Sequence, residues 1–484
     1  MTKFYIDQHG CAKNQVDGEI LISKLIDDGY EFADNSDAAD VIIINSCGFI
    51  ESAKKESLDA LYNTRAAYPK KKIILAGCLA ERYAKIFKDN LPEADGVFGN
   101  GDLLTISEFM KAIDEKKSRK NKTVTEITEQ KGVCCYNRKH FMNYKNSCYV
   151  KITEGCSNHC SFCAIPVIRG ELRSRPVKEV VNEIKSLLKQ GIFEINLIGQ
   201  DLAAYGTGIT DRQSFKNEDG SSQLSLLLNE ISKLKGNFWI RLLYINPDHF
   251  NEDILKCIEK DPRILAYFDI PFQSGDTEII HSMNRTGSKE SYISLVKKIR
   301  SKLPEVALRT TLMTGFPGET DEAFNNTLEF LQTITPDWSG CFSYSREEDT
   351  PAYKFKNKIA KKISKERAEI LESIQEKITE TRLKKRINKF YDVLIEELID
   401  GEDDTAFAIG RAWFQAPDVD GAFVVRYEKD DKAAVKAIKP GRVVYVKADR
   451  VSGVDIDSYF IKDSELNIKK KNSFLFQLTK MRTI

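Results

Sequence analysis

Short apolar runs alternate with amphipathic stretches along the first hundred residues of the chain. The apolar runs have the length and composition of buried strands. Between them, apolar residues recur at helical spacing, which predicts helices near 14–28, 51–66 and 81–89. Such β-α-β alternation indicates a parallel sheet with helical crossovers. The three predicted strands are KFYIDQHG (3–10), VIIINSC (41–47) and KIILAGC (72–78).

A second set of alternating strands and helices follows between residues 147 and 360. It contains six β-α units, fewer than the eight that close a full β/α barrel. The pattern therefore predicts a partial, open-sided barrel. Its predicted strands are 149–155, 195–201, 239–245, 266–273, 307–315 and 338–345.

The last third of the chain changes its pattern twice. A charged amphipathic stretch predicts a connecting helix, with Ile370, Leu371, Ile374 and Ile378 on one face. Short strands with turn signals then predict a small all-β barrel. The predicted fold class is α/β, with three domains: an N-terminal three-layer α/β domain (1–115), a partial (β/α)6 barrel (147–360) and an all-β barrel (389–462). A polar linker (116–146), the connecting helix (361–388) and a tail without assignment (463–484) make up the rest of the chain.

Composition agrees with a soluble protein of this organisation. At about 150 residues per domain, 484 residues suffice for three domains. No apolar run approaches the roughly 18 residues of a membrane span, and MTKFYIDQHG lacks the apolar core of a signal peptide. We therefore expect a cytoplasmic protein without a membrane partner. The formal net charge of +1 gives no general attraction for nucleic acid.

The chain contains eleven cysteines. An odd number in a cytosolic chain argues against a disulfide framework. Cys156, Cys160 and Cys163 form a C-x3-C-x2-C motif just after the first barrel strand, where such barrels build active sites. A 4Fe–4S cluster suits three thiolates on a short loop and leaves one iron open. Zinc remains an alternative, although His159 is an awkward fourth ligand beside Cys160.

Cys11, Cys47 and Cys78 each lie at or just past the end of one of the first three strands. The carboxyl ends of parallel strands lie side by side, so three residues far apart in sequence should converge. This arrangement predicts a second metal site. The alternative is three buried small hydrophobic residues.

Together these features resemble the radical S-adenosylmethionine (SAM) methylthiotransferases over roughly 3–460. The resemblance implies that Cys156, Cys160 and Cys163 hold a 4Fe–4S cluster whose open iron binds SAM. It implies that Cys11, Cys47 and Cys78 hold an auxiliary 4Fe–4S cluster that carries or sacrifices the inserted sulfur. SAM would serve as methyl donor and as source of a 5′-deoxyadenosyl radical, with electrons from a donor such as flavodoxin or ferredoxin. The motifs are GCAKNQVDGE (10–19), INSCGFIESAKKESLDAL (44–61), LAGCLAERY (75–83), EGCSNHCSFCAIPVIRGELRSRP (154–176) and LRTTLMTGFPGETDEAF (308–324).

This family divides by substrate. The RimO-like branch modifies the β-carbon of an aspartate in small-subunit ribosomal protein S twelve, and the MiaB-like branch modifies an isopentenyladenosine in tRNA. GCAKN, CGFIESAKKES, WIRLLYINPD and GRAWFQAPDVDG resemble the first branch, and the last of these lies in a module that resembles a TRAM domain. PFQSGD (271–276) and LIGQD (197–201) depart from the RimO pattern, and PFQSGD favours the tRNA branch.

Charge in the predicted β-barrel offers a separate test of the substrate. Residues 391–420 contain nine Asp or Glu residues and one Arg, a net charge of −8. A tRNA-binding surface should be basic, whereas an acidic one suits a basic protein partner. A solvated acidic edge without a partner is the alternative.

Residues near the ends of the other barrel strands are candidates for a SAM and substrate pocket. Gln200 and Asp201 close the second strand, and the turn TGFPGE (314–319) permits close backbone approach. Turn geometry alone also accounts for those glycines, and Phe162 has either an adenine-packing or an ordinary packing role. By resemblance, the predicted SAM-binding residues are Phe162, Gln200, Asp201, Gln273, Arg309, Gly315 and Gly318.

Two further questions remain open at the level of sequence. Cys257 and Cys341 are predicted core residues, whereas the Cys134–Cys135 pair has no predicted role. An iron–sulfur or zinc protein without catalysis is the alternative from a different functional class. Such a protein would not cleave SAM.

Overall fold

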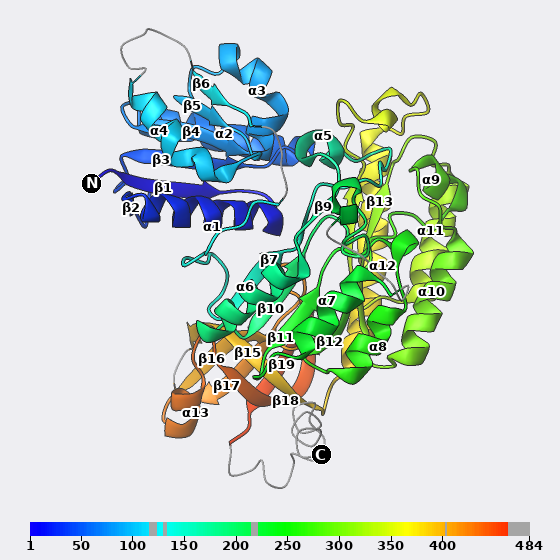
Figure 1. The fold of residues 1–484 in the computed structure, drawn as a ribbon. Helices are drawn as coiled ribbons and strands as arrows, with labels where there is room; N and C mark the ends of the chain where they lie inside the picture. The colour runs from blue at the N-terminus through cyan, green and yellow to red at the C-terminus, as the bar shows by residue number, and fades with distance from the viewer. Residues whose placement is uncertain (116–122, 129–132, 214–220, 402–403, 463–484) are drawn as a thin grey trace.

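The computed structural model describes residues 1–115, 123–128, 133–213, 221–401 and 404–462. They form three bodies arranged along one axis (Figure 1). The first is a six-stranded parallel sheet of order β2-β1-β3-β4-β5-β6. Its elements are β1 (Lys3–Gln8), α1 (Ala12–Asp27), β2 (Glu31–Phe32), β3 (Val41–Ser46), α2 (Glu51–Ala67), β4 (Lys72–Gly77), α3 (Cys78–Asn90), β5 (Gly96–Phe98), α4 (Ile106–Glu115) and β6 (Val124–Glu126).

Alternation along the central strand β3 explains why this domain has three layers. Ile43 packs in one core with residues of α1 and α4, such as Ile20 and Phe109. Its neighbours Ile42 and Ile44 pack on the opposite face with residues of α2 and α3. Successive side chains of a strand point to opposite faces, so a continuous apolar run covers both. The predicted three-layer α/β fold is confirmed.

The predicted linker is partly wrong. Residues 124–126 form β6, which pairs in parallel with β5 and extends the first sheet. A strand of three residues is too short to produce a periodic pattern, and the polar composition around it concealed it from the sequence analysis.

The second body is the partial barrel, a parallel sheet of order β14-β13-β12-β11-β10-β7. β7 and β14 are its two edges, so the barrel is open as predicted. Its strands are β7 (Ser147–Lys151), β10 (Glu194–Ile198), β11 (Trp239–Leu242), β12 (Ile264–Asp269), β13 (Ala307–Thr314) and β14 (Trp338–Ser343). The helices are α5 (Ile165–Arg169), α6 (Val177–Lys189), α7 (Gln223–Ser232), α8 (Asp253–Lys260), α9 (Thr277–Ser282), α10 (Lys289–Lys302) and α11 (Asp321–Ile334), and β8 (Thr153–Glu154) pairs with β9 (Arg173–Ser174).

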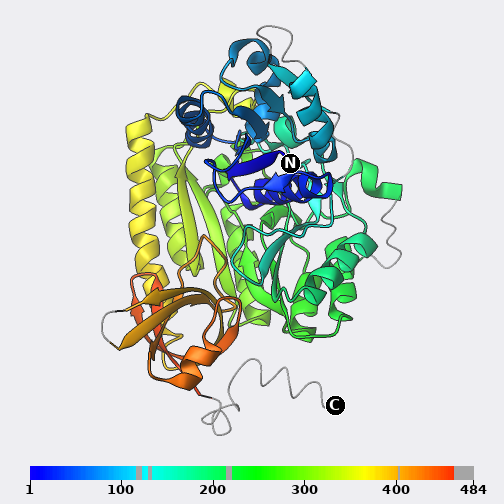
Figure 2. The same ribbon diagram turned by 90° about the vertical axis from the view of Figure 1, so that its left-hand side faces the viewer.

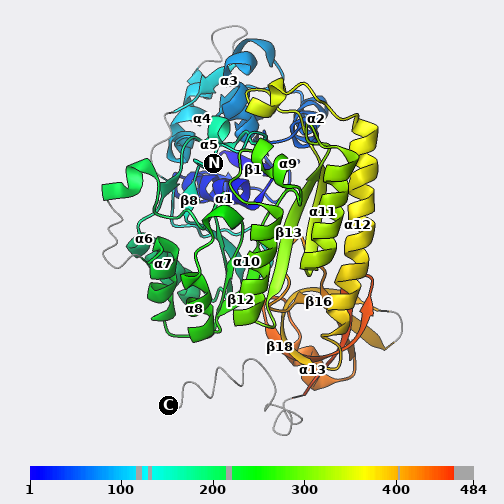
Figure 3. The same cartoon turned by 90° about the vertical axis from the view of Figure 1, so that its right-hand side faces the viewer.

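Helix α12 (Lys361–Lys384) runs along the β14 edge of the barrel toward the third body (Figure 3). Leu371 is fully buried in the barrel core, and Ile374 and Ile378 pack against that core. Ile370 is exposed, so the predicted apolar face is one residue narrower.

The third body is a closed five-stranded barrel, as predicted, of order β15-β16-β17-β19-β18. Its strands are β15 (Phe390–Asp400), β16 (Thr405–Arg411), β17 (Phe423–Glu428), β18 (Val443–Ser452) and β19 (Asp455–Phe460), with the short helix α13 (Lys432–Ala437). The first body and this barrel lie at opposite ends of the central one (Figure 2). Lys151, the last residue of β7, contacts the first body, whereas Trp338, the first of β14, donates to the backbone of Phe414 in the third-body segment that follows β16. The carboxyl ends of the central strands therefore face the N-terminal domain.

Within the described residues, no helix is long and apolar enough to cross a membrane.

Candidate functional site

The first set of cysteines meets where three neighbouring strands end. Cys11 follows β1, Cys47 follows β3 and Cys78 begins α3 directly after β4. A Cβ built on Gly10 would lie 3.0 Å from the Cβ of Cys47, and one on Gly48 would lie 2.7 Å from the backbone oxygen of Cys78. The glycines beside the cysteines thus let the three loops approach closely, and the strand ends converge as their spacing predicted.

Two cations act on these thiols. Cys11 is exposed on one side, and loss of solvent on the other would raise its pKa, but the charges of Lys13 and Arg169 and backbone hydrogen bonds lower it. Burial raises the pKa of Cys47 to about 12, and burial also raises that of Cys78 although Arg169 opposes the shift. Metal ligation requires thiolates. Nearby positive charge is what such a set of thiolates needs, so the donors and their surroundings fit an iron–sulfur cluster.

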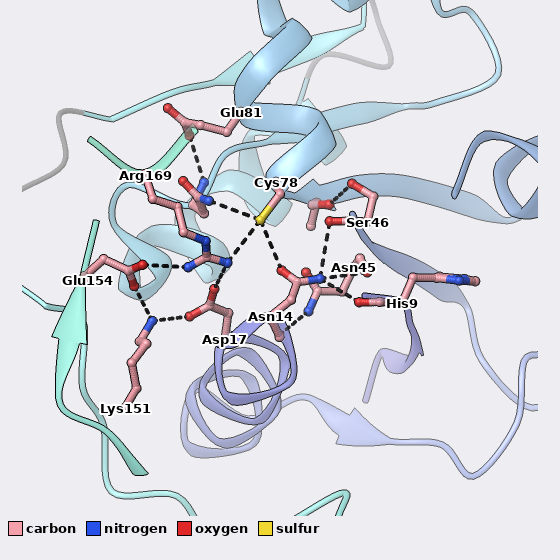
Figure 4. Close-up of polar contacts among 12 residues, drawn as sticks. His9, Asn14, Asp17, Asn45, Ser46, Cys78, Glu81, Lys151, Glu154 and Arg169 are labelled. Atoms are coloured by element: carbon pink, nitrogen blue, oxygen red, sulfur yellow. Dashed lines mark hydrogen bonds and ion pairs between the residues drawn. The ribbon is translucent and has the colours of Figure 1, made fainter. Parts of the chain in front are cut away.

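Arg169 connects the two parts of the molecule at this point (Figure 4). Its Nη2 lies 3.0 Å from the Sγ of Cys78 and 2.8 Å from Asp17 of α1, while Nη1 lies 2.8 Å from Glu154 of β8. The Nζ of Lys151 lies 2.5 Å from both of these carboxylates. The four charged side chains form a closed, buried network between the N-terminal domain and the barrel.

The second set of cysteines lies on the loop between β8 and α5. Burial raises the pKa of Cys156 and of Cys163 to about 12. Cys160 faces the guanidinium of Arg285. Cys78 packs against Ala164 and Ile168, which directly follow this set. The structure thus brings the two cysteine sets to the same end of the barrel.

His159 does not complete the second set. Its Nε2 pairs with Glu171 at 3.3 Å, and its side chain is 56% exposed. As the side chains stand in the described residues, no three His, Cys, Asp or Glu groups are arranged to hold a metal ion. The assignment of both sets therefore rests on the thiol donors, their placement and the charges beside them.

A cavity of about 410 Å³ opens beside Cys156 and Cys160. Asp201 lies in its wall and accepts hydrogen bonds from Nδ1 of His249 at 2.8 Å and Nδ2 of Asn158 at 3.0 Å. Burial alone would raise the pKa of Asp201, but these hydrogen bonds hold it below its usual value. The hydrogen bond to Asp201 in turn raises the pKa of His249. Asp201 therefore supports the cysteine loop through Asn158.

Gln200 and Gln273 carry buried polar atoms without a partner. Neither amide atom of Gln200 has a hydrogen-bond partner among the described residues, and neither does Oε1 of Gln273. A buried polar atom left unpaired costs about 1–3 kcal/mol. Gln273 also has a positive φ of 71°, held by backbone hydrogen bonds to β13 at 2.7–2.8 Å. Both amides fit a polar ligand such as SAM at the strand ends.

Two of the other predicted cofactor residues, Gly315 and Phe162, have packing or hydrogen-bond partners within the fold. The backbone N–H of Gly315 donates to Glu319 at 2.8 Å, and a Cβ on Gly315 would lie 2.2 Å from Oγ of Ser364 on α12. Gly318 has a φ of 93° and open space around it. Phe162 packs against the apolar cluster around Phe316. Docking on α12 thus explains Gly315, whereas the open space at Gly318 leaves its predicted cofactor contact as a prediction.

Arg309 forms an ion pair between two domains. It is the third residue of β13, five residues before the end of that strand at Thr314. Its Nη1 pairs with Asp420 at 2.6 Å and donates to the backbone of Val419 at 3.0 Å, both in the third-body segment between β16 and β17. Arg309 therefore has a partner within the fold, and the expected cofactor contact remains a prediction.

Packing explains the two departures from the RimO pattern. A Cβ on Gly199 of LIGQD would lie 2.0 Å from Oγ1 of Thr153, and one on Gly275 of PFQSGD would lie 2.3 Å from the Cβ of Phe330. Asp276 caps α9 by accepting from the N–H of Ile279 at 3.0 Å. Local packing therefore accounts for both glycines, Gly199 and Gly275, without reference to the substrate.

Fewer acidic side chains of residues 391–420 are exposed than the net charge of this segment suggested. Glu396 is buried and forms an ion pair with Arg411 at 2.6 Å, and Asp420 forms an ion pair with Arg309. Burial raises the pKa of Asp392 to about 7. Glu402 and Asp403 lie outside the described residues. The exposed acids that remain are Glu397, Asp400, Asp404 and Asp418.

Cys257 and Cys341 are core residues, as predicted, and Cys148 is another. Cys134 packs against the first core and Cys135 is exposed. The sequence analysis missed Arg169 and Arg285, which contact the cysteines. Arg169 lies six residues after Cys163, at the end of the short helix α5, and this proximity to the second cysteine set was a signal that we did not use. No sequence pattern identifies Arg285.

Three family models match the chain, one for each body. Residues 3–99 match the uncharacterized protein family UPF0004, residues 150–331 the radical SAM superfamily and residues 387–461 the TRAM domain. A structure of the radical SAM methyltransferase TsrM from Kitasatospora setae, with cobalamin and a 4Fe–4S cluster bound, superimposes with a TM-score of 0.52. It is 13% identical and covers 73% of this chain and 74% of that chain, so the likeness shows the fold alone.

Similar sequences identify the family more closely than the fold does. The ribosomal protein uS12 methylthiotransferase RimO of Treponema denticola is 50% identical over 94% of this chain and 99% of its own length. The protein of the same name from Carboxydothermus hydrogenoformans is 35% identical over 95% of this chain and 100% of its own. Because identity of this degree extends along nearly the whole of both chains, the chain belongs to the RimO family of radical SAM methylthiotransferases.

Proposed function

We propose that this protein adds a methylthio group to the β-carbon of an aspartate in ribosomal protein uS12. In this proposal, Cys156, Cys160 and Cys163 hold the cluster that binds SAM, and Cys11, Cys47 and Cys78 hold the auxiliary cluster. The observation that carries the proposal is the contact of Cys78 with Ala164 and Ile168, which joins the two cysteine sets at one end of the barrel. Two relatives with 50% and 35% identity bear the name of this activity.

The residues around the two sets have separate tasks. The bound groups would supply the 5′-deoxyadenosyl radical, the methyl group and the sulfur. Arg285 places a positive charge at Cys160, and Asp201 fixes the loop through Asn158. The unpaired amide atoms of Gln200 and the unpaired Oε1 of Gln273 are polar groups available to orient SAM. An electron donor such as flavodoxin or ferredoxin is part of the proposal.

A competition experiment tests the substrate. Reconstituted protein, sulfide, reductant and methyl-labelled SAM are offered uS12 and isopentenylated tRNA together, without oxygen. We expect label in uS12, mapped by fragmentation to one aspartate. Label in the tRNA alone would overturn the substrate and retain the chemistry.

Cysteine variants test the division between the two sets. Cys160→Ala should abolish SAM cleavage, because the cluster that binds SAM loses a ligand. Cys47→Ala should preserve SAM cleavage and stop sulfur insertion. Cleavage is measured as 5′-deoxyadenosine by chromatography, and equal loss in both variants would refute this division. Cys257→Ala, in the barrel core away from both sets, is the matched control.

A further inference from the structure

Lys13 extends from the N-terminal domain onto the mouth of the barrel. It is the second residue of α1 and only 8% exposed. Its Nζ lies 3.3 Å from the centroid of the Tyr244 ring, in the segment just after β11. Asp269, the last residue of β12, is among the charged groups near it. The ammonium is therefore enclosed by the ends of barrel strands.

No carboxylate in the described part of the chain pairs with this ammonium. Lys151, which is also buried, contrasts with it by contacting Asp17 and Glu154 at 2.5 Å. Lysine is rarely buried without a partner, because removing its charge from water costs several kcal/mol. The ring of Tyr244 offsets part of this cost. Cys11 and Asp269 lie near the ammonium, but neither forms a hydrogen bond or ion pair with it in the described part of the chain, so its N–H donors remain available to an incoming anion.

The surroundings of Lys13 indicate where that anion binds. On one side lies Cys11 with the first cysteine set. On the other side, Tyr244 and Asp269 continue into a polar wall that ends at Arg309. Arg309 is satisfied by Asp420 at 2.6 Å, so it does not compete for an incoming acid. Lys13 therefore lies between the first cysteine set and this polar wall.

We propose that Lys13 binds the side-chain carboxylate of the target aspartate, with the ring of Tyr244 holding the ammonium in position. This inference rests on the proposed function, which supplies an aspartate as the target. The β-carbon is bonded directly to that carboxylate, so binding at Lys13 fixes the reacting carbon beside the first cysteine set. An amide or a nucleobase lacks the negative charge, so the same contact selects for aspartate.

The test compares two synthetic peptides that span the target aspartate of uS12. One carries Asp at the target position and the other carries Asn. Dissociation constants are measured by fluorescence anisotropy with the reconstituted holoenzyme. We expect the wild type to prefer the Asp peptide at least about tenfold, which corresponds to about 1.4 kcal/mol. Lys13→Met should remove the preference and Lys13→Arg should retain part of it. Tyr244→Leu should weaken it, because the ammonium loses its support.

Controls separate substrate binding from assembly of the sulfur site. Iron, sulfide and electron paramagnetic resonance spectra are measured for every variant. Cys47→Ala removes a cysteine of the first set and keeps Lys13, so it should retain the Asp preference. A preference that persists in Lys13→Met, or that is lost equally in Cys47→Ala, would overturn the inference. Wild-type holoenzyme that never labels uS12 would instead refute the proposed function, whatever the peptides show.

Discussion

At the scale of single residues, Arg169 does the most to relate the two cysteine sets. It is the last residue of α5, the helix that follows the second set, yet it donates to a sulfur of the first. The planar guanidinium contacts Glu154, Asp17 and Cys78 at once. A lysine presents its charge at one point and does not reproduce this fork.

Arg169→Lys should therefore lower the reduction potential of the auxiliary cluster. A hydrogen bond to a ligating sulfur stabilises the more negative, reduced state. Its loss is expected to shift the potential by on the order of 50 mV. A redox titration followed by electron paramagnetic resonance measures this.

The control for that titration is Arg65→Lys. Arg65 pairs with Asp95 at 2.7 Å within the N-terminal domain and does not hydrogen-bond a cysteine in the described structure. An equal shift in both variants would mean that Arg169 acts only through general stability.

At the scale of elements, a buried carboxylate on β10 joins the central barrel to the C-terminal one. Glu194 contacts Arg241 of β11 at 2.8 Å and Arg411 of β16 at 2.6 Å. Burial alone would raise the pKa of Glu194, but Arg411 and Arg241 hold it well below its usual range. The junction is thus a buried ion network spanning two domains.

Glu194→Gln should destabilise this junction by about 3–5 kcal/mol, because Arg241 remains buried without a carboxylate partner and Arg411 keeps only Glu396. The three tryptophans, Trp239, Trp338 and Trp413, report on it, since each lies at this end of the central barrel or in the segment docked there. Denaturant titration followed by tryptophan fluorescence measures the effect. Glu366→Gln, on the exposed side of α12, should change stability by less than about 0.5 kcal/mol.

The same carboxylate predicts a pH dependence. The pKa of Glu194 is lower in the folded protein than in the unfolded chain, where it is about 4.3. The contribution of Glu194 to the free energy of unfolding is therefore complete above that pKa and is lost as the pH falls below it. Wild type should therefore lose stability between about pH 5 and pH 3 more steeply than Glu194→Gln. Parallel acid profiles for the two proteins would contradict this assignment.

Strands and cysteine positions were accessible from sequence because they depend on local patterns. Cys11, Cys47 and Cys78 mark strand ends, and parallel strand ends must meet. Arg309 lies on its predicted strand, but its partner Asp420 belongs to another domain and could not be predicted from local sequence. Lys13 was missed because Tyr244 likewise comes from another domain. The position of Arg169 after the second cysteine set was a usable signal, but its contacts with Asp17 and Cys78 of the N-terminal domain were not predictable from it.

At the scale of the whole molecule, the open barrel is held at both edges by the N-terminal domain. Near the β7 edge, Lys151 and Arg169 bind Asp17. Beyond the β14 edge, Glu347 accepts from Lys54 of α2 and Arg82 of α3, both at 2.7 Å. An incomplete barrel has no ring of hydrogen bonds to fix its width. The N-terminal domain supplies that constraint and so sets the spacing of the two cysteine sets.

Glu347→Gln tests this constraint directly. Arg82 also donates to the backbone of Gly48, the residue after Cys47, so releasing it should loosen the first cysteine set. We expect backbone amides over 47–58 and 344–350 to exchange hydrogen at least about tenfold faster, while those around Lys151 remain protected. Glu348→Gln is the matched control, because that neighbouring side chain is exposed and contacts only Tyr83 among the described residues. Equal exchange in the two variants would show that the β14 edge is held by packing alone. Faster exchange confined to Glu347→Gln would show that one buried carboxylate holds this side of the barrel closed.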